Sequence, residues 1–497
     1  MSFLRRGFLP GILLLSACFG QSLPLTPEVQ SALDRVSAQS LRGNLSFLAS
    51  DLLEGRDTPS RGLDLAAEYI AAQFRRAGLE PAGGDGYFQT APFEVYEPRT
   101  DHFRLELAAG GQTVAVGAGE VRAQSPAAVD VKQAGVFLMH ADTPEPQAGD
   151  VAGKVVILDA GKSGQLGGWM FRRMRALRAM QPAAVLLIDR EGMYFQSEAS
   201  NRLVDPEAAA PQAVLVVHSA PLARVLDDLP PGAAEAAVTL HLDEAVKKPV
   251  TLRNVIGVLR GSDPGLRDSC VLVTAHYDHI GVRTSGEGDR IYNGANDDGS
   301  GTVSVIELAH ALAALPHRPK RSIVFLTFFG EEKGGFGARY YARHPVFPIE
   351  KTVADVNLEQ LGRTDSTEGP QIATATFTGF EYSDLPEVFR EAGKLTGVTV
   401  YKDEQNSDAF FSRSDNQMLA NQGIPAHTVC VAFEYPDYHG VSDHWEKIDY
   451  DNMAKVDRML ALGVLMLADN PAPPHWDAKN SKVASYLKAW KERHAGD

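Results

Sequence analysis

Cysteine is scarce in this chain. Three cysteines occur in 497 residues, and two of them, Cys270 and Cys430, stand in the apolar runs CVLVTA and HTVCVAF. Cysteines in such runs usually behave as small apolar side chains inside the protein. We therefore expect two buried thiols, and the pattern argues against a disulfide framework or a cysteine nucleophile.

Basic charge and long hydrophobic runs are also missing. The formal net charge is −15, and an acidic chain without a basic block argues against nucleic acid as a main partner. Beyond the first twenty residues, no apolar run approaches the roughly 20 residues that a membrane-spanning helix needs. A phosphate-binding loop is excluded as well, because GKSG at 161–164 lacks its upstream glycine and has Val156 there instead.

The first twenty residues, MSFLRRGFLPGILLLSACFG, have the pattern of an export signal. Two arginines precede an apolar run that is too short to span a bilayer. LSAC at 15–18 resembles a bacterial lipoprotein box with Cys18 as the lipidated residue, and cleavage after Gly20 is the alternative. Both alternatives predict export, to the periplasm, the outside or the outer membrane of a bacterium. Membrane contact is expected only through a lipid on Cys18.

Two regions of the chain differ in their hydrophobic pattern. Between 250 and 470, strand-like runs such as CVLVTA and RSIVFLTFF alternate with helix-like stretches, which indicates parallel βαβ units. Between 130 and 245, short apolar runs are separated by Gly/Pro-rich stretches, which favours a compact β-rich module. The expected fold class is α/β, with a mostly parallel central sheet flanked by helices and an inserted β-rich module.

Residues able to bind a metal follow the strand-like runs of the second region. They are His276 and Asp278, Asp297 in the loop GANDDGSG (294–301), Glu331 and Glu332, Glu359, and Tyr438, His439 and Asp443. Each group alone has an ordinary explanation as a polar pair, a turn or solvated charge. The carboxyl ends of parallel strands, however, meet in one crevice, where so many carboxylates would repel one another without a cation. Imidazole and carboxylate ligands without thiolate suit Zn²⁺, with Mn²⁺ or Co²⁺ as substitutes.

The spacing of these residues predicts separate roles. In a strand, residues i and i+2 face the same way, so His276 can bind a metal while Asp278 orients its ring. His279 is expected to point elsewhere and not to be a ligand. Glu331 and Glu332 are adjacent and cannot both point at the same spot from an extended backbone. One of them is expected to bind metal while the other takes a proton from water.

In this order, the motifs resemble the co-catalytic di-zinc exopeptidases related to bacterial and fungal secreted aminopeptidases. Glutamate carboxypeptidase and the transferrin receptor ectodomain belong to the same superfamily. The stretches FLASDLLEGRDTPSRG and AAEYIAAQF are similar to the lead-in of that family, and the β-rich module resembles its inserted protease-associated domain. With the export signal at 1–20 and a C-terminal tail at 471–497, the resemblance implies a zinc peptidase domain at 21–128 and 246–470 and an inserted domain at 129–245.

The resemblance also implies roles for single residues and two zinc ions per chain. The implied metal ligands are His276, Asp297, Glu332, Glu359 and His439. Glu331 is then the general base, Tyr438 polarises the scissile carbonyl, and Asp278 and Asp443 support the ligands. Two positions depart from the family pattern. Glu359 replaces the usual aspartate and is longer by one methylene, and Ser414-Asp415-Asn416 replaces Ser-Asp-His, so Ser414 and Asp415 are given only a substrate-side role.

An acidic pocket suits the free α-amine of a peptide, so aminopeptidase activity on a peptide substrate is the first expectation. Carboxypeptidase activity is an alternative, because Arg363 and Arg413 lie near the motifs and a cation could hold a terminal carboxylate. A glutaminyl-cyclase-like enzyme with one zinc and a non-catalytic, receptor-like binding protein are further alternatives. A sugar- or calcium-binding module around GANDDGSG would leave the paired glutamates and His439 unexplained. The sequence does not indicate an oligomeric state.

Overall fold

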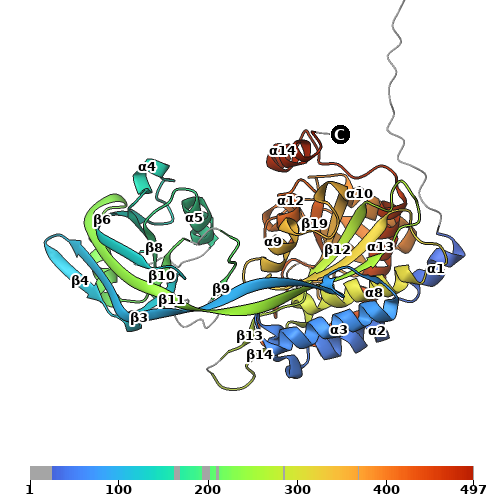
Figure 1. Cartoon of the computed structure of the whole chain (residues 1–497), viewed down its shortest axis with the longest axis horizontal. Helices are drawn as coiled ribbons and strands as arrows, with labels where there is room; N and C mark the ends of the chain where they lie inside the picture. Colours follow the sequence, from blue (N-terminus) through green and yellow to red (C-terminus); the bar gives the residue numbers. More distant parts are fainter. Residues whose placement is uncertain are drawn as a thin grey trace, which may run out of the picture.

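The computed structural model describes residues 25–161, 168–192, 202–208, 212–283, 286–365, 367 and 369–495. The expected signal peptide and Cys18 lie outside these residues. Two lobes are joined by two long antiparallel strands, β3 (Phe88–Ala109) and β11 (Gly232–Leu259), which run from one lobe into the other (Figure 1). In the described part of the chain, no helix is long and apolar enough to cross a membrane.

The larger lobe is built on a mostly parallel sheet. Its four central strands lie in the order β15 (Ser322–Phe328), β12 (Cys270–His276), β16 (Thr352–Leu358) and β19 (Ala426–Cys430), and they run parallel. β11 pairs antiparallel with β15 at one side, and β17 (Thr374–Phe377) pairs antiparallel with β19 at the other, followed by β18 (Thr399–Tyr401). The structure confirms the predicted fold class.

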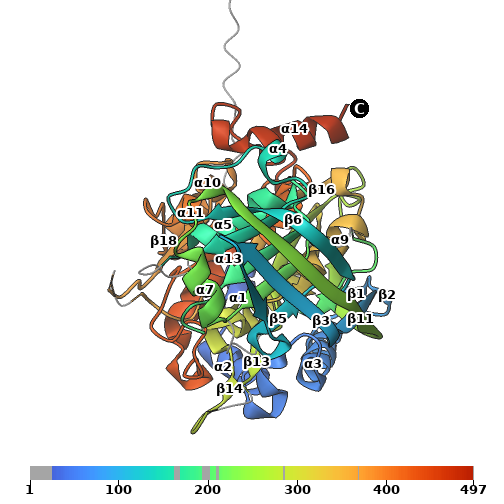
Figure 2. The same cartoon turned by 90° about the vertical axis from the view of Figure 1, so that its left-hand side faces the viewer.

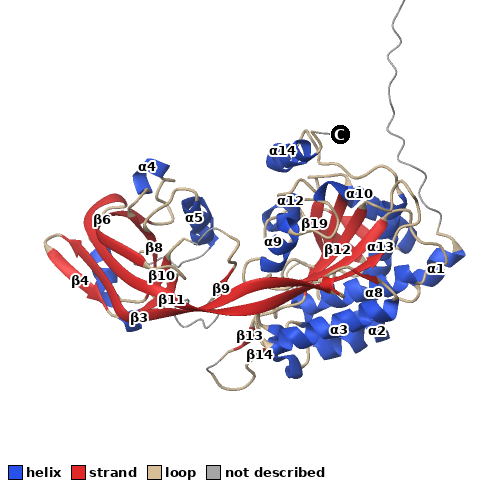
Figure 3. Ribbon diagram, viewed as in Figure 1, coloured by secondary structure: helices blue, strands red, loops and turns tan. Residues whose placement is uncertain are grey.

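Helices cover both faces of this sheet (Figure 3). One core contains residues of α2 (Ala38–Leu48), α3 (Arg61–Ala77), α8 (Gly301–Ala313), α10 (Leu385–Thr396) and α13 (Tyr450–Asp469), and the opposite core contains residues of α9 (Phe336–Arg343) and α12 (Asn416–Ala420). Strand β12 shows how one strand contributes side chains to both cores. Val271, Val273 and Ala275 pack into the first core, and Cys270 and Leu272 into the second, because side chains alternate along a strand. Strands buried on both faces therefore read as continuous apolar runs.

The smaller lobe is built on the far part of the same sheet, which continues through β3 and β11, and it faces the viewer in Figure 2. Its strand order is β4 (Gln112–Val116), β3, β11, β6 (Val129–Met139), β7 (Val155–Asp159), β8 (Ala184–Ile188), β10 (Val214–Val217) and β5 (Val121–Gln124), with helices α4 (Ala148–Val151), α5 (Gly168–Arg178) and α7 (Ala220–Leu226). One core of this lobe extends from Leu105 to Leu242. It includes residues upstream of 129, where the sequence placed the start of the insert, because the second half of β3 pairs with β4 and β11 there.

The segment after residue 470 is not a free linker. Trp476 and Val483 are buried, and the Trp476 indole Nε1 donates a hydrogen bond to the Gly423 carbonyl over 2.8 Å. Helix α14 (Ala484–Arg493) follows and packs on the second core of the larger lobe. The apolar side chains of this short region, which the sequence treated as a tail, thus complete the second core of the larger lobe.

The remaining elements are short. They are α1 (Pro27–Leu33), β1 (Glu80–Pro81), β2 (Gly84–Asp85), β9 (Leu203–Val204), β13 (Gly281–Val282), β14 (Ile291–Tyr292) and α11 (Ser407–Phe410). Gly78 ends α3 in the left-handed conformation, with φ 75°, which a glycine adopts without steric cost. Cys270 and Cys430 are both buried, as predicted.

Candidate metal centre

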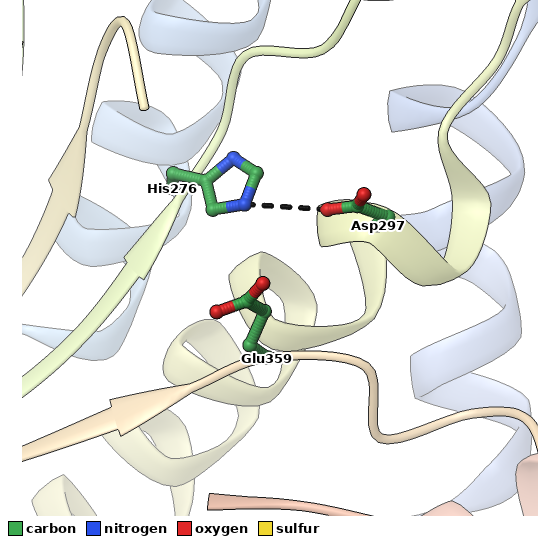
Figure 4. Close-up of side chains that lie close together, drawn as sticks. All are labelled: His276, Asp297 and Glu359. Carbon is green, nitrogen blue, oxygen red and sulfur yellow. Dashed lines mark ion pairs between the residues drawn. The ribbon is translucent and has the colours of Figure 1, made fainter. Parts of the chain in front are cut away.

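Two clusters of imidazole and carboxylate groups meet at the carboxyl end of the parallel sheet and share Asp297. In the first, ligand atoms of His276, Asp297 and Glu359 all lie within 4.8 Å of one another. His276 is the last residue of β12 and Glu359 directly follows β16. Figure 4 shows these three side chains gathered around a common space, and His276 Nε2 lies 3.4 Å from Asp297 Oδ1. The longer Glu359 side chain therefore still reaches the cluster.

The second cluster combines Asp297 with Glu332 and two histidines. Ligand atoms of His279, Asp297 and Glu332 lie within 4.8 Å of one another. His439 Nε2 lies 3.0 Å from Asp297 Oδ2 and 3.5 Å from a Glu332 oxygen. The Tyr438 ring stacks on the His439 ring, with centroids 4.1 Å apart. The structure thus brings together all five residues for which the sequence suggested metal binding.

The expectation that His279 points elsewhere is wrong. Strand β12 ends at His276, so the alternation of a strand no longer applies three residues later. His279 is fully buried, and its Nδ1 lies 2.8 Å from Glu332 Oε1. Gly294 makes room for this ring, because a Cβ at that position, where φ is 58°, would lie 2.4 Å from His279 Cγ. The glycine that opens GANDDGSG is therefore needed for His279 to enter the site.

Asp278 and Asp443 hold backbone around the clusters. His276 Nδ1 is 3.2 Å from the Asp278 carbonyl oxygen and 3.6 Å from its carboxylate, so the carbonyl is the partner of the ring. The Asp278 carboxylate accepts instead from the backbone N–H of Glu331, at 3.0 Å. Asp443 Oδ2 accepts from the backbone N–H groups of Asn296 and Asp297, at 2.9 and 3.2 Å. Both aspartates thus position the chain that carries the ligands.

A buried arginine that the sequence analysis did not single out holds the same region. Arg56 is 1 % exposed, and its guanidinium donates to the carbonyl oxygens of Leu48, Tyr277, Asn293 and Gly294 over 2.5–2.9 Å. It ties the chain after β12 to the start of the GANDDGSG loop. Burial lowers the pKa of Arg56 to about 10, against the attraction of Asp278 and other carboxylates. The guanidinium remains a cation at neutral pH.

The site holds more carboxylates than its cations can neutralise. Burial raises the pKa of Glu331 well above its usual range, and nearby carboxylates including Asp415 add to the shift. Burial also raises the pKa of Glu359, with a hydrogen bond from Ser414 opposing the shift. Burial alone would raise the pKa of Asp297, but hydrogen bonds from His276 and His439 hold it well below its usual range. Such crowding is typical of functional and metal-binding sites.

Several ligand-type atoms of the clusters have ion-pair contacts at most and make no hydrogen bond of good geometry among the described residues. They are His276 Nε2, both ring nitrogens of His279, and Glu332 Oε1. A buried polar atom left unpaired costs about 1–3 kcal/mol, and a cation in each cluster would satisfy His276 Nε2, Glu332 Oε1 and one nitrogen of His279. Nitrogen and oxygen donors without thiolate match the ligand preferences of zinc. The residues present therefore fit a zinc site.

A cavity of about 430 Å³ opens on these clusters. Its walls include Asp297, Glu331, Glu332, Glu359, Ser414, Tyr438 and His439, together with Phe410, Arg413 and Phe433. Ser414, which was given a substrate-side role, thus lines the cavity, where its Oγ also accepts from Asn357 Nδ2 at 2.9 Å. Asp415 is not among the lining residues; it is 1 % exposed, and burial raises the pKa of its carboxyl well above the usual range.

Comparison with known proteins finds a matching family and similar folds. Residues 254–464 match the family model described as peptidase family M28. An aminopeptidase from Aneurinibacillus sp. strain AM-1 superposes with a TM-score of 0.56 at 21 % identity, covering 90 % of this chain and 97 % of that one. A zinc aminopeptidase from Bacillus subtilis gives a TM-score of 0.51 at 18 % identity, covering 88 % and 96 %. At these identities the likeness concerns the fold.

Curated relatives match only part of the chain. A probable zinc metalloprotease of Pyrenophora teres f. teres is 35 % identical over 129 residues, which are 26 % of this chain and 26 % of the relative. A vacuolar membrane protease of Colletotrichum graminicola is 40 % identical over 92 residues, 18 % of this chain and 8 % of the relative. The expected localisation in or outside a bacterium is contradicted, because several matching relatives are vacuolar membrane proteases of fungi.

Proposed function

We propose that the protein is an aminopeptidase that holds two zinc ions, from the premise that residues 254–464 match the model of peptidase family M28. The observation that carries the proposal is the pair of clusters sharing Asp297 at the wall of a cavity that also contains Glu331. A carboxylate shared by two sets of ligands suits two neighbouring cations. A glutamate beside them supplies the base that peptide hydrolysis needs.

His276, Asp297 and Glu359 would hold one zinc ion, and Asp297, Glu332 and His439 the other, with His279 beside the second group. Zinc bound there supplies a Lewis acid that polarises the peptide carbonyl and makes water more acidic. The protein supplies the fixed positions of the ligands. His276 and Glu359 stand at strand ends, and Asp297 is fixed through its backbone N–H by Asp443.

Glu331 is the proposed general base. It takes a proton from the water that attacks the carbonyl carbon and delivers a proton to the departing amine, so the peptide bond breaks to give a free amino acid and a shortened peptide. Tyr438 lines the same cavity, and its hydroxyl would donate a hydrogen bond to the developing oxyanion. The stacking of its ring on His439 limits the positions open to the tyrosine.

The carboxylate oxygens of the cavity support cleavage from the amino end. Four carboxylates line it, those of Asp297, Glu331, Glu332 and Glu359. Two bound zinc ions would offset their charge, but carboxylate oxygens still accept hydrogen bonds from a protonated α-amine, whereas a blocked amine is neutral and a C-terminal carboxylate has no N–H to donate. An N-terminal residue is therefore expected to enter with its amine toward the carboxylates and its carbonyl toward Glu331.

We also propose that the smaller lobe, whose core extends from Leu105 to Leu242, is an inserted domain of the protease-associated type that begins before residue 129. The parallel arrangement of β6, β7, β8 and β10 and the separate core of the smaller lobe support a unit of its own.

Hydrolysis of aminoacyl-p-nitroanilides by the zinc-loaded protein tests the proposal. We expect activity that a metal chelator abolishes and that added zinc restores. Glu331→Gln should lower kcat by about 10²- to 10⁴-fold while zinc content stays unchanged, because Glu331 is not among the cluster ligands. Glu350→Gln, at an exposed glutamate of the same lobe, is the matched control and should behave as the wild type. A zinc-loaded protein without activity on any free-amine substrate would refute the proposal.

A further inference from the structure

One cation stands among the residues that line the candidate active-site cavity. Arg413 belongs to that lining together with four carboxylates and His439, and no other arginine or lysine is among the lining residues that the structure describes. The side chain is exposed. Within the described part of the chain it makes no ion pair, although four carboxylates line the same cavity. A guanidinium in this situation has its hydrogen-bonding fork available for a ligand.

Aromatic rings fix the position of this guanidinium. Its central carbon lies 4.2 Å from the centroid of the Phe410 ring. Phe410 in turn packs on Phe433, with ring centroids 4.9 Å apart, and both rings line the cavity. Stacking on an aromatic face leaves the edge of the guanidinium plane, where its N–H groups point, free to bind an anion.

The other arginine near the motifs is already neutralised. Arg363 Nη1 lies 2.8 Å from Asp437 Oδ2, and Arg363 is not among the residues lining the cavity. Nothing in the sequence favoured Arg363 or Arg413 as the residue that binds a carboxylate, and the structure distinguishes them. Only Arg413 combines a place in the cavity with an unpaired charge.

Arg413 also lies close to the proposed chemistry. The next residue, Ser414, hydrogen bonds to Asn357 and to the carboxylate of Glu359, which belongs to the first cluster. Successive residues of a peptide are roughly 3.8 Å apart, so a carboxylate within one residue of the scissile amide stays inside a cavity of this size. Two kinds of substrate offer such a group: a dipeptide through its C-terminal carboxylate, and a peptide with an N-terminal aspartate or glutamate through its side chain.

We propose that Arg413 binds a substrate carboxylate within one residue of the scissile amide, so that short peptides carrying a negative charge at this position are the preferred substrates. This inference rests on the proposed function and adds a substrate class to it. The amine and the carboxylate of the substrate are then held at opposite parts of one cavity, by the carboxylates around Asp297 and by Arg413.

Paired substrates that differ only in charge test the proposal. Leu-Gly is compared with Leu-glycinamide, and glutamyl-p-nitroanilide with glutaminyl-p-nitroanilide, for the wild type, Arg413→Gln and Arg413→Lys. We expect Arg413→Gln to lower the ratio of kcat/KM values, charged over neutral, by about 10- to 100-fold in one pair. Arg413→Lys should restore part of the ratio because it keeps the charge without the bidentate fork. The pair that responds identifies which carboxylate is bound.

Arg390→Gln is the matched control. Arg390 also stacks on a phenylalanine, Phe380, at 4.9 Å from its centroid, but lines a different cavity. This variant loses the same type of contact and should leave both ratios unchanged. A ratio that changes by less than about threefold in both pairs for Arg413→Gln would overturn the carboxylate site.

Equilibrium binding tests the carboxylate site at Arg413 independently of the proposed aminopeptidase activity. Isothermal titration of Leu-Gly and Leu-glycinamide into zinc-loaded Glu331→Gln, with and without Arg413→Gln, measures recognition without turnover. Weaker binding of Leu-Gly alone on loss of Arg413 supports the site even if no free-amine substrate is hydrolysed, an outcome that would refute the aminopeptidase. Cleavage of N-acetyl-Leu-Gly would also refute the aminopeptidase, and it would indicate a carboxypeptidase. Equal affinities with and without Arg413 would overturn the C-terminal carboxylate as its ligand and, together with unchanged p-nitroanilide ratios, the site itself, while normal hydrolysis of p-nitroanilides leaves the aminopeptidase standing.

Discussion

The two clusters that share Asp297 are built in different ways. In the first, His276 ends a strand, Glu359 directly follows another, and His276 is 1 % exposed. In the second, Glu332 and His439 both stand in loops, and the His439 side chain is 40 % exposed at a backbone φ of 52°. Strand ends are held by the hydrogen bonds of the sheet, whereas loop ligands depend on contacts made elsewhere. The first cluster is therefore expected to be rigid without metal and the second to depend more on it.

Removing one histidine from each cluster gives the largest contrast. In the metal-free protein, His276→Ala leaves Asp297 and its neighbours buried without their cation and should lower the free energy of unfolding by about 3–5 kcal/mol. His439→Ala removes a part-exposed partner and should cost less than about 1 kcal/mol. Urea unfolding of both variants after dialysis against chelator measures the two values. Equal losses would show that the clusters do not differ in rigidity.

Substitution of Arg56 tests whether contacts outside the sheet contribute to the rigidity of the first cluster. Arg56→Met removes the donors to four buried carbonyl oxygens and should lower the free energy of unfolding by about 2–3 kcal/mol. Arg61→Met, at an exposed arginine of α3, should stay within about 0.5 kcal/mol of the wild type. Urea unfolding gives both numbers. If Arg56→Met were as mild as its control, the tie between β12 and the GANDDGSG loop would not contribute to stability.

Asp443 positions Asp297, the ligand that both clusters share. Its loss should therefore affect both clusters and reduce the difference between them. Asp443→Ala releases the backbone N–H groups of Asn296 and Asp297 and is expected to weaken zinc binding about 10- to 100-fold. Competition with a chromophoric chelator reads out the affinity of each site. Asp451→Ala, at an exposed position of α13, serves as the control. Weakening at one site only would mean that Asp443 supports one cluster rather than Asp297.

The same contrast explains what could be predicted from the sequence. His276 and Glu359 were placed correctly because buried strands are readable as apolar runs and their ends must meet. His279 was misplaced because the chain leaves the strand after His276, and only the three-dimensional path of the GANDDGSG loop decides where its ring lies. Arg56 carries no local signal, since three of its carbonyl partners are 221, 237 and 238 residues away. Arg413 and Arg363 look alike in sequence, and in the structure they differ because Arg363 pairs with Asp437 and only Arg413 of the two lines the cavity.

Zinc-edge anomalous diffraction from crystals of the zinc-loaded protein tests the central claim most directly. The account predicts two peaks on either side of Asp297, one beside His276 and Glu359 and the other beside Glu332 and His439, and the map would show whether His279 also binds. A single peak, or two peaks away from Asp297, would contradict it.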